Sequence, residues 1–109
     1  MSDVLGTFEQ AVLLAVVRLG PDAYGRAILT EAQVRLQRDV TAGAAYATLD
    51  RLEAKDLISS RLGGGTPVRA GRPRRYYVIE RAGLQALNDS RHVVDLLWRG
   101  FQWPLKGRP

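Results

Sequence analysis

The chain lacks several features that would point to other functions. Its 109 residues contain no cysteine, only one histidine and only two lysines. Without cysteine it has no disulfide, no thiolate nucleophile and no zinc–thiolate site. No apolar run reaches the roughly 18 residues of a membrane span, and residues 1–20 lack the pattern of a signal peptide. We therefore expect a cytoplasmic protein with no membrane partner, built as one domain with one modest core.

Motifs for catalysis or metal binding are missing too. His92 has no second ligand-type residue at a useful spacing, and a solvated side chain is the ordinary interpretation of it. There is no Ser-His-Asp set and no HExxH, and the glycines at 63–65 are not followed by the Lys-Ser/Thr of a phosphate-binding loop. The sequence predicts no enzyme, no metal site and no cofactor.

Arginine is abundant instead. The chain has 14 arginines and a net charge of +5. Six arginines against one acid, Glu80, fall between residues 58 and 81, whereas residues 1–57 are close to balanced. Because the planar guanidinium suits phosphate, this local excess is typical of a surface that contacts a nucleic-acid backbone.

Hydrophobic periodicity and turn residues predict the order of elements. Thr7 and Gln10 form a candidate capping box, and Asp22 and Thr41 are candidate N-caps. A loop rich in glycine and proline separates two strand-like runs. The predicted elements are helices over 7–19, 22–37 and 42–56, strands over 57–62 and 74–79, a helix over 81–102, and a loose tail over 103–109.

The third predicted helix is a candidate for the recognition helix of a helix-turn-helix, whose first turn meets base edges in the major groove. Gly43 in its first turn either permits close approach of a ligand or is a harmless small residue. A plain helical hairpin would give the same pattern. The side chains predicted to face DNA are small at the start of this helix and polar further along: Thr41, Ala42, Ala44, Tyr46, Thr48 and Arg51.

A basic hairpin directly after a recognition helix is the arrangement of a winged helix. Arg72, Arg74 and Arg75 would contact phosphates and release counterions, whereas a solvated charged loop is the alternative. The predicted fold is mainly α with a small β-hairpin, a winged helix-turn-helix over 1–80 with an added C-terminal helix over 81–102. On that helix, Leu87, Val94 and Phe101 are seven residues apart, close to the spacing of a coiled coil.

The chain resembles the PadR family of bacterial transcriptional regulators, in the short form with a single C-terminal helix. Four stretches carry the resemblance and together span about residues 5–90: 8-FEQAVLLAVVRLG-20, 24-YG-25, 43-GAAYATLDRLEAKDLI-58 and 71-GRPRRYYVIERAG-83. The resemblance implies a homodimeric repressor on a near-palindromic double-stranded DNA operator, with Tyr24 and Tyr46 near the DNA backbone. It also implies that the helix over 81–102 is the dimerisation helix, with its contact through Leu87, Val94, Leu97, Trp98 and Phe101. The chain departs from the family pattern at Ala45, commonly Leu, and at Glu80, often Thr or Ser.

Trp98 has two interpretations. In multidrug-sensing members of the family, a tryptophan on the C-terminal helix stacks flat aromatic ligands, which implies a small aromatic effector here. Alternatively, Trp98 only anchors the dimer by burying a large apolar area. Two other functions stay open at this point: a non-specific basic nucleic-acid-binding protein, and a winged-helix adaptor between proteins.

Overall fold

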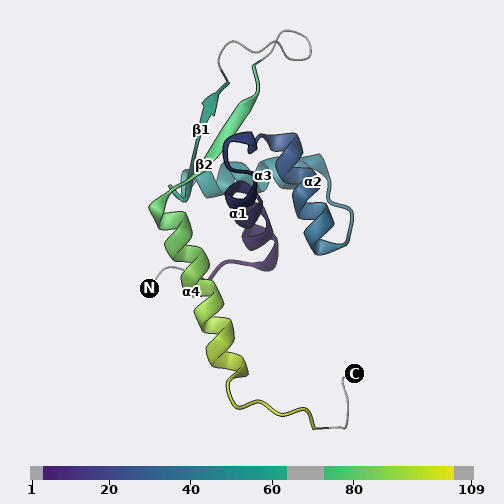
Figure 1. Cartoon of the computed structure of the whole chain (residues 1–109), viewed down its shortest axis with the longest axis vertical. Coiled ribbons are helices and arrows are strands. Elements are labelled where there is room, and N and C mark those ends of the chain that lie inside the picture. The colour runs from purple at the N-terminus through teal and green to yellow at the C-terminus, as the bar shows by residue number, and fades with distance from the viewer. Residues whose placement is uncertain (1–3, 64–72, 105–109) are drawn as a thin grey trace.

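A computed structural model describes residues 4–63 and 73–104. Three helices and a two-stranded hairpin form one unit, and a fourth helix projects from it (Figure 1). This order confirms the predicted mainly helical class with a β-hairpin. The elements are α1 (Thr7–Leu19), a 3-10 turn η1 (Gly20–Asp22), α2 (Gly25–Leu36), α3 (Ala42–Ala54), β1 (Ile58–Leu62), β2 (Arg75–Ile79) and α4 (Arg81–Trp98).

The bounds predicted for α1 are confirmed, but its predicted cap is wrong by one residue. Gly6 is the N-cap, and its N–H donates to Glu9 Oε1 at 3.2 Å. Gln10 instead donates from Nε2 to the carbonyl of Leu5 at 2.9 Å. The helix start therefore uses Glu9 and Gln10 to bind the two backbone groups that precede Thr7.

Helix α2 starts three residues later than predicted. Gly20–Asp22 forms the separate turn η1, so Asp22 does not cap α2. Tyr24 is the N-cap, with an extended backbone and no side-chain hydrogen bond to the helix. The helix ends where Gln37 adopts the left-handed conformation, at a φ of 55°.

Helix α3 begins as predicted, because Thr41 Oγ1 accepts a hydrogen bond from the N–H of Ala44 at 3.1 Å. It ends at Ala54, two residues before the predicted end. Asp56, at a φ of 62°, then turns the chain into β1.

The hairpin is antiparallel, with Ile58 paired with Ile79 and Leu62 with Arg75. Side chains alternate between its two faces, so Tyr77 points to the core and Tyr76 to the other side. The loop that carries Arg72 lies outside the described residues.

The residues just before α2 extend this small sheet. Tyr24 forms an isolated antiparallel bridge with Tyr76. The N–H of Tyr77 donates to the carbonyl of Ala23 at 2.8 Å. The hairpin is therefore held against the start of α2 as well as against the end of α3.

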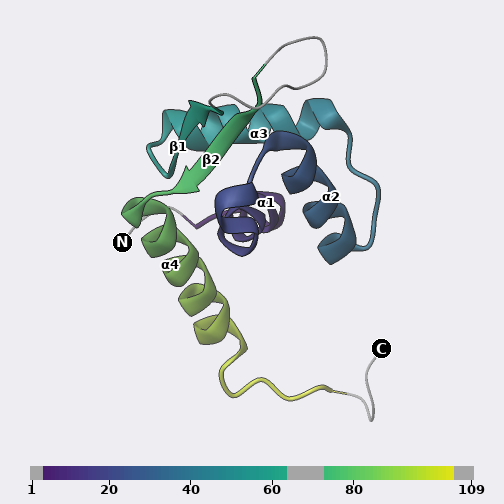
Figure 2. The same ribbon diagram turned by 45° about the horizontal axis from the view of Figure 1, so that its top comes forward.

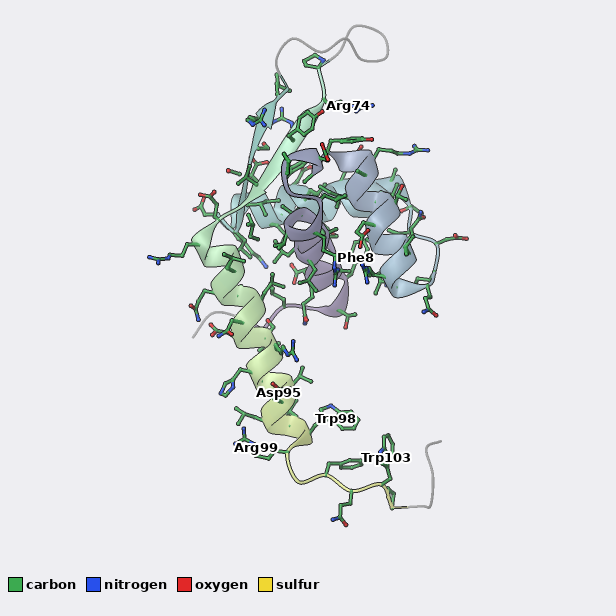
Figure 3. All side chains as sticks on the ribbon, in the orientation of Figure 1. Phe8, Arg74, Asp95, Trp98, Arg99 and Trp103 are labelled. Atoms are coloured by element: carbon green, nitrogen blue, oxygen red, sulfur yellow. The ribbon has the colours of Figure 1, made fainter. Side chains whose placement is uncertain are left out.

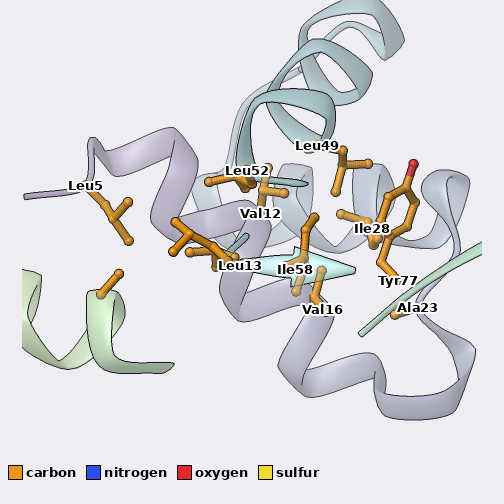
Figure 4. Packing of buried hydrophobic residues seen from close by; sticks show 13 residues of the cluster. Leu5, Val12, Leu13, Val16, Ala23, Ile28, Leu49, Leu52, Ile58 and Tyr77 are labelled. Carbon is orange, nitrogen blue, oxygen red and sulfur yellow. The ribbon is translucent and has the colours of Figure 1, made fainter. Parts of the chain in front are cut away.

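Helix α1 is the centre of the core, enclosed by the other two short helices and the hairpin (Figure 2). Buried apolar side chains from the other three α-helices and from both strands meet around it (Figure 4). They include Leu5, Val12, Leu13, Val16, Ala23, Ile28, Leu49, Leu52, Ile58, Tyr77 and Ala86.

Helix α4 is attached to this core by its first half only. Gly83 lies so close to β1 and β2 that a Cβ there would come within 2.6 Å of Ile79 Cδ1. Ser90 is fully buried, and its Oγ accepts a hydrogen bond from the N–H of Leu5 at 2.9 Å. Leu87, the first residue predicted to contact a second copy of the helix, packs against the core of its own chain. After Ser90, no described residue is buried.

The end predicted for this helix, residue 102, is wrong. Helix α4 ends at Trp98, because Arg99 is extended and Gly100 takes a positive φ of 76°. Phe101 therefore lies beyond the helix. The molecule measures 58 × 30 × 20 Å, with a radius of gyration of 16.4 Å against about 13 Å for a compact chain of this length. Within residues 4–63 and 73–104, no helix is long and apolar enough to cross a membrane.

We expect Ser90→Ala to lower the free energy of unfolding by about 1–3 kcal/mol, because it leaves the buried N–H of Leu5 without its acceptor. Denaturant unfolding at fixed protein concentration would measure this. Ser59→Ala is the matched control, since the Ser59 hydroxyl donates to Glu80 on the exposed surface and should change stability by less than about 0.5 kcal/mol. Equal effects of the two substitutions would contradict the role of Ser90.

Candidate nucleic-acid interface

The first half of α3 presents a slim, exposed surface. Ala42, Gly43, Ala44 and Ala47 are all exposed, and a Cβ built on Gly43 would meet nothing within 4 Å. No acidic residue lies in the first turn of α3 or of α2. Such a surface can approach a polyanion closely without steric or electrostatic hindrance.

Tyr46 connects α3 to the start of α2. Its side chain is 44% exposed, and its ring lies over Gly25. A Cβ at Gly25 would come within 2.6 Å of the Tyr46 Oη, so only glycine leaves room for this ring. The packing places the Tyr46 hydroxyl beside the N-terminus of α2.

Two predicted DNA-facing residues of α3 are placed differently. Thr48 is only 2% exposed, so the prediction that its side chain reaches a groove is wrong. Its hydroxyl accepts a hydrogen bond from Arg51 Nη2 at 3.3 Å. Arg51 Nε also lies 3.8 Å from Glu9 Oε2, which pairs with Lys55 at 3.5 Å as well. Arg51 is thus directed toward α1 and away from the first turn of α3.

Cations and tyrosine rings alternate near the loop end of the hairpin. The guanidinium carbon of Arg74 lies 4.1 Å from the centroid of the Tyr24 ring (Figure 3 labels Arg74). Tyr24 meets Tyr76 edge to face, with centroids 5.8 Å apart. Arg61 lies 5.5 Å from the centroid of Tyr76. Each tyrosine therefore contacts one arginine, and Tyr24 holds Arg74 beside the start of α2.

Arg75 serves the other face of the hairpin. Its Nη1 donates to Ser60 Oγ at 2.9 Å, and Ser60 in turn donates to Glu53 Oε2 at 2.6 Å. Burial raises the pKa of the neighbouring Tyr77 above its usual 10.0, and Arg75 partly opposes that rise. Tyr77 therefore stays neutral near pH 7 and acts as a core residue.

A continuous path of contacts joins the candidate residues. Tyr46 of α3 packs on Gly25, Gly25 follows Tyr24, and Tyr24 contacts Arg74. The sequence contained each of these residues but gave no sign of their contacts, because the residues come from three separate elements. The contribution of Arg61 was also missed, because it depends on the hairpin register, which pairs Arg61 with Tyr76.

The far end of the molecule carries a cluster of aromatic rings. The ring of Trp98 lies 5.3 Å from Phe101 and 5.9 Å from Trp103, centroid to centroid (Figure 3). Phe101 and Trp103 are 5.3 Å apart. Trp103, predicted to belong to a loose tail, thus packs against the end of α4, and all three side chains remain about half exposed. In the described part of the chain, no group of His, Cys, Asp and Glu could hold a metal ion.

Comparisons with known proteins agree with this arrangement. The family model for PadR-like transcriptional regulators matches residues 13–89. A PadR-like transcription factor from Bacteroides fragilis is 26% identical, with a TM-score of 0.70 over 86% of this chain and 85% of that one. A PadR family transcriptional regulator from Eggerthella lenta is 27% identical, with a TM-score of 0.63 over 82% and 75%.

A more distant structure, a PadR-like transcriptional regulator from Bacillus cereus, shares the fold. It is 23% identical, with a TM-score of 0.71 over 94% of this chain and 95% of that one. The search of curated proteins found no match.

A substitution at Gly43 should affect helix stability and DNA binding in opposite directions, because a side chain there would meet no other residue of the protein. We expect Gly43→Ala to stabilise α3, by up to about 1 kcal/mol, because alanine is the better helix former and meets no neighbour. We expect the same substitution to weaken DNA binding about tenfold, as the loss of one close contact to a base would. Thermal unfolding and fluorescence anisotropy would measure the two effects. Gly6→Ala, which alters the start of α1, is the control, and undiminished DNA binding by Gly43→Ala would show that this turn stays clear of the duplex.

Proposed function

The chain belongs to the PadR-like family of transcriptional regulators, and from this we propose that it is a repressor which binds a near-palindromic operator as a homodimer. Membership of the family makes it a winged-helix DNA-binding regulator, and transcriptional regulators are not a class of enzymes. We further propose that it represses transcription, that its operator is symmetric, and that an effector releases it from the DNA.

The path of contacts from α3 to the hairpin is the observation that supports DNA recognition most strongly. We assign base contacts in the major groove to the slim first turn of α3, with Thr41, Ala42 and Ala44. We assign the flanking phosphates to Tyr46, Tyr24 and the hairpin arginines, including Arg72 and Arg75. Thr48 leaves this set because it is buried.

The unpaired half of α4 supports the homodimer. Beyond Ser90 no described residue of the helix is buried, and Val94, Leu97 and Trp98 lie on its surface, with Leu97 75% exposed. A helical segment this short is not stable alone in water, so these residues need an apolar partner. A second copy of α4 supplies one with matching length and chemistry, and it also generates the two-fold symmetry that a near-palindromic operator requires.

The aromatic cluster supports a small aromatic effector. Trp98, Phe101 and Trp103 are each about half exposed, so ring faces remain available for stacking at the end of the dimerisation helix. We place such a ligand at Trp98, across the two-fold axis. We also propose that the protein works in the cytoplasm, where its DNA is.

The first experiment is an anisotropy titration with the DNA just upstream of the protein's own gene, in excess unrelated competitor and at several salt concentrations. We expect tight binding by two protomers per site, with log affinity falling about 0.9 per phosphate neutralised for each unit of log salt. Binding that competitor DNA abolishes would identify a general nucleic-acid binder. No binding at low salt would identify an adaptor that has lost DNA recognition.

The dimer can be tested with a single charge. We expect Leu97→Asp to convert the dimer to a monomer, because it places a carboxylate in the proposed apolar contact between copies. Loss of the second half-site should weaken operator binding by about 100-fold or more. Analytical ultracentrifugation and anisotropy would measure these effects.

Val34→Asp is the matched control. Val34 is 65% exposed on α2, away from α4, so the same substitution there should change neither the mass in solution nor the operator affinity. A Leu97→Asp variant that remains dimeric would place the interface elsewhere.

A further inference from the structure

Arg74 differs from Arg75 and Arg51, whose side chains bind polar groups of the protein itself. Arg75 is hydrogen-bonded to Ser60, and Arg51 lies beside Glu9. Arg74 is exposed, and in residues 4–63 and 73–104 no carboxylate forms an ion pair with it. Its defined contact there is the Tyr24 ring, 4.1 Å from the guanidinium carbon.

The Tyr24 ring is itself held in place. Its backbone pairs with Tyr76, and its ring meets the Tyr76 ring edge to face at 5.8 Å. The hydrogen bond from Tyr77 to Ala23 fixes the preceding residue. A half-buried ring tied in this way is a rigid surface against which a long, flexible side chain can be ordered.

A guanidinium that rests on a ring keeps its N–H donors for another partner. Aromatic contact uses the π face of the ring and the flat face of the cation, whereas the hydrogen bonds of arginine lie in its own plane. Two oxygens of a phosphate match those in-plane donors. The contact thus restricts the rotamers of Arg74 without occupying the groups that would bind an anion.

We propose that Tyr24 is a positioning residue that holds the Arg74 guanidinium for a backbone phosphate of duplex DNA. Tyr24 acts through Arg74, and its own hydroxyl makes no essential bond to the DNA. The partner is a phosphate because Arg74 is held over Tyr24, beside the start of α2, whereas base edges lie deep in the grooves. The inference rests on the proposed function and refines the contact assigned there to Tyr24.

A double-mutant cycle tests this directly. The four proteins are wild type, Tyr24→Leu, Arg74→Gln and the double variant, titrated with the upstream duplex and with an unrelated duplex of equal length. We expect Arg74→Gln to weaken binding about tenfold and Tyr24→Leu about threefold. The double variant should bind as Arg74→Gln does, because without Arg74 the ring has nothing to position.

The salt dependence gives a second readout, which a purely structural role would not change. Arg74→Gln should reduce the slope of log affinity against log salt by about 0.9. Tyr24→Leu should reduce it in the same direction although it changes no charge. Both losses should be equal on the two duplexes, since a phosphate carries no sequence.

Two further variants separate the ring from its hydroxyl and from general damage. Tyr24→Phe keeps the ring and should bind within about twofold of wild type. Arg75→Gln removes the same charge one residue away on the other face of the hairpin, so its effect should add to that of Tyr24→Leu. If Tyr24→Leu does not fold, Tyr24→Met takes its place in the cycle.

The other outcomes would each contradict this inference. Additive losses for Tyr24→Leu and Arg74→Gln, or a Tyr24→Phe loss as large as that of Tyr24→Leu, would overturn the positioning role and leave the regulator standing. A loss confined to the upstream duplex would replace the phosphate with a base. Failure of the wild type to bind either duplex would overturn the proposed function and this inference together.

Discussion

The hydrogen bond from the Tyr77 N–H to the Ala23 carbonyl is the contact on which the DNA-facing surface depends. It joins β2 to the residue before the N-cap of α2, so the hairpin and the helix pair share one backbone framework. The Tyr24–Tyr76 bridge extends the same pairing by one residue. Without this attachment, Arg74 would have no fixed position relative to Tyr24, and the hairpin would be held by its packing on α1, α3 and the start of α4.

Two glycines allow close packing between the elements that this framework joins. Gly25 lets the Tyr46 ring lie directly on the start of α2, and Gly83 lets α4 begin directly against the strands. At both positions a side chain would collide with backbone or ring atoms, so the packing of these elements requires glycine. The small residues at the start of α3 have another role, because Gly43 faces open space and is not required by packing.

Local signals in the sequence were enough to predict the order of elements and several of their ends. The apolar stripe of α1 and the Gly-Pro pair after it predict Thr7–Leu19, and the Thr41 cap predicts the start of α3. The start of α2 was missed because residues 23 and 24 pair with a strand far along the chain. Thr48 was misplaced because a polar residue was assumed to face solvent, although it lies on the same helical face as Ala45 and Leu52. The end of α4 was missed although Gly100, a common helix terminator, was visible in the sequence.

Arg74 of the hairpin and the aromatic residues Trp98 and Trp103 lie toward opposite ends of the long axis of the molecule (Figure 3). The first half of α4 joins the two ends. Gly83 packs directly against the hairpin, and Ser90 accepts a hydrogen bond from Leu5. Leu5 is also bound by Gln10 of α1, the helix at the centre of the core. In a dimer built on α4, these contacts set the angle at which each winged-helix unit leaves the dimer axis. In the proposed dimer, the distance between the two copies of α3, and therefore the spacing of half-sites, would depend on these few buried contacts at the start of α4.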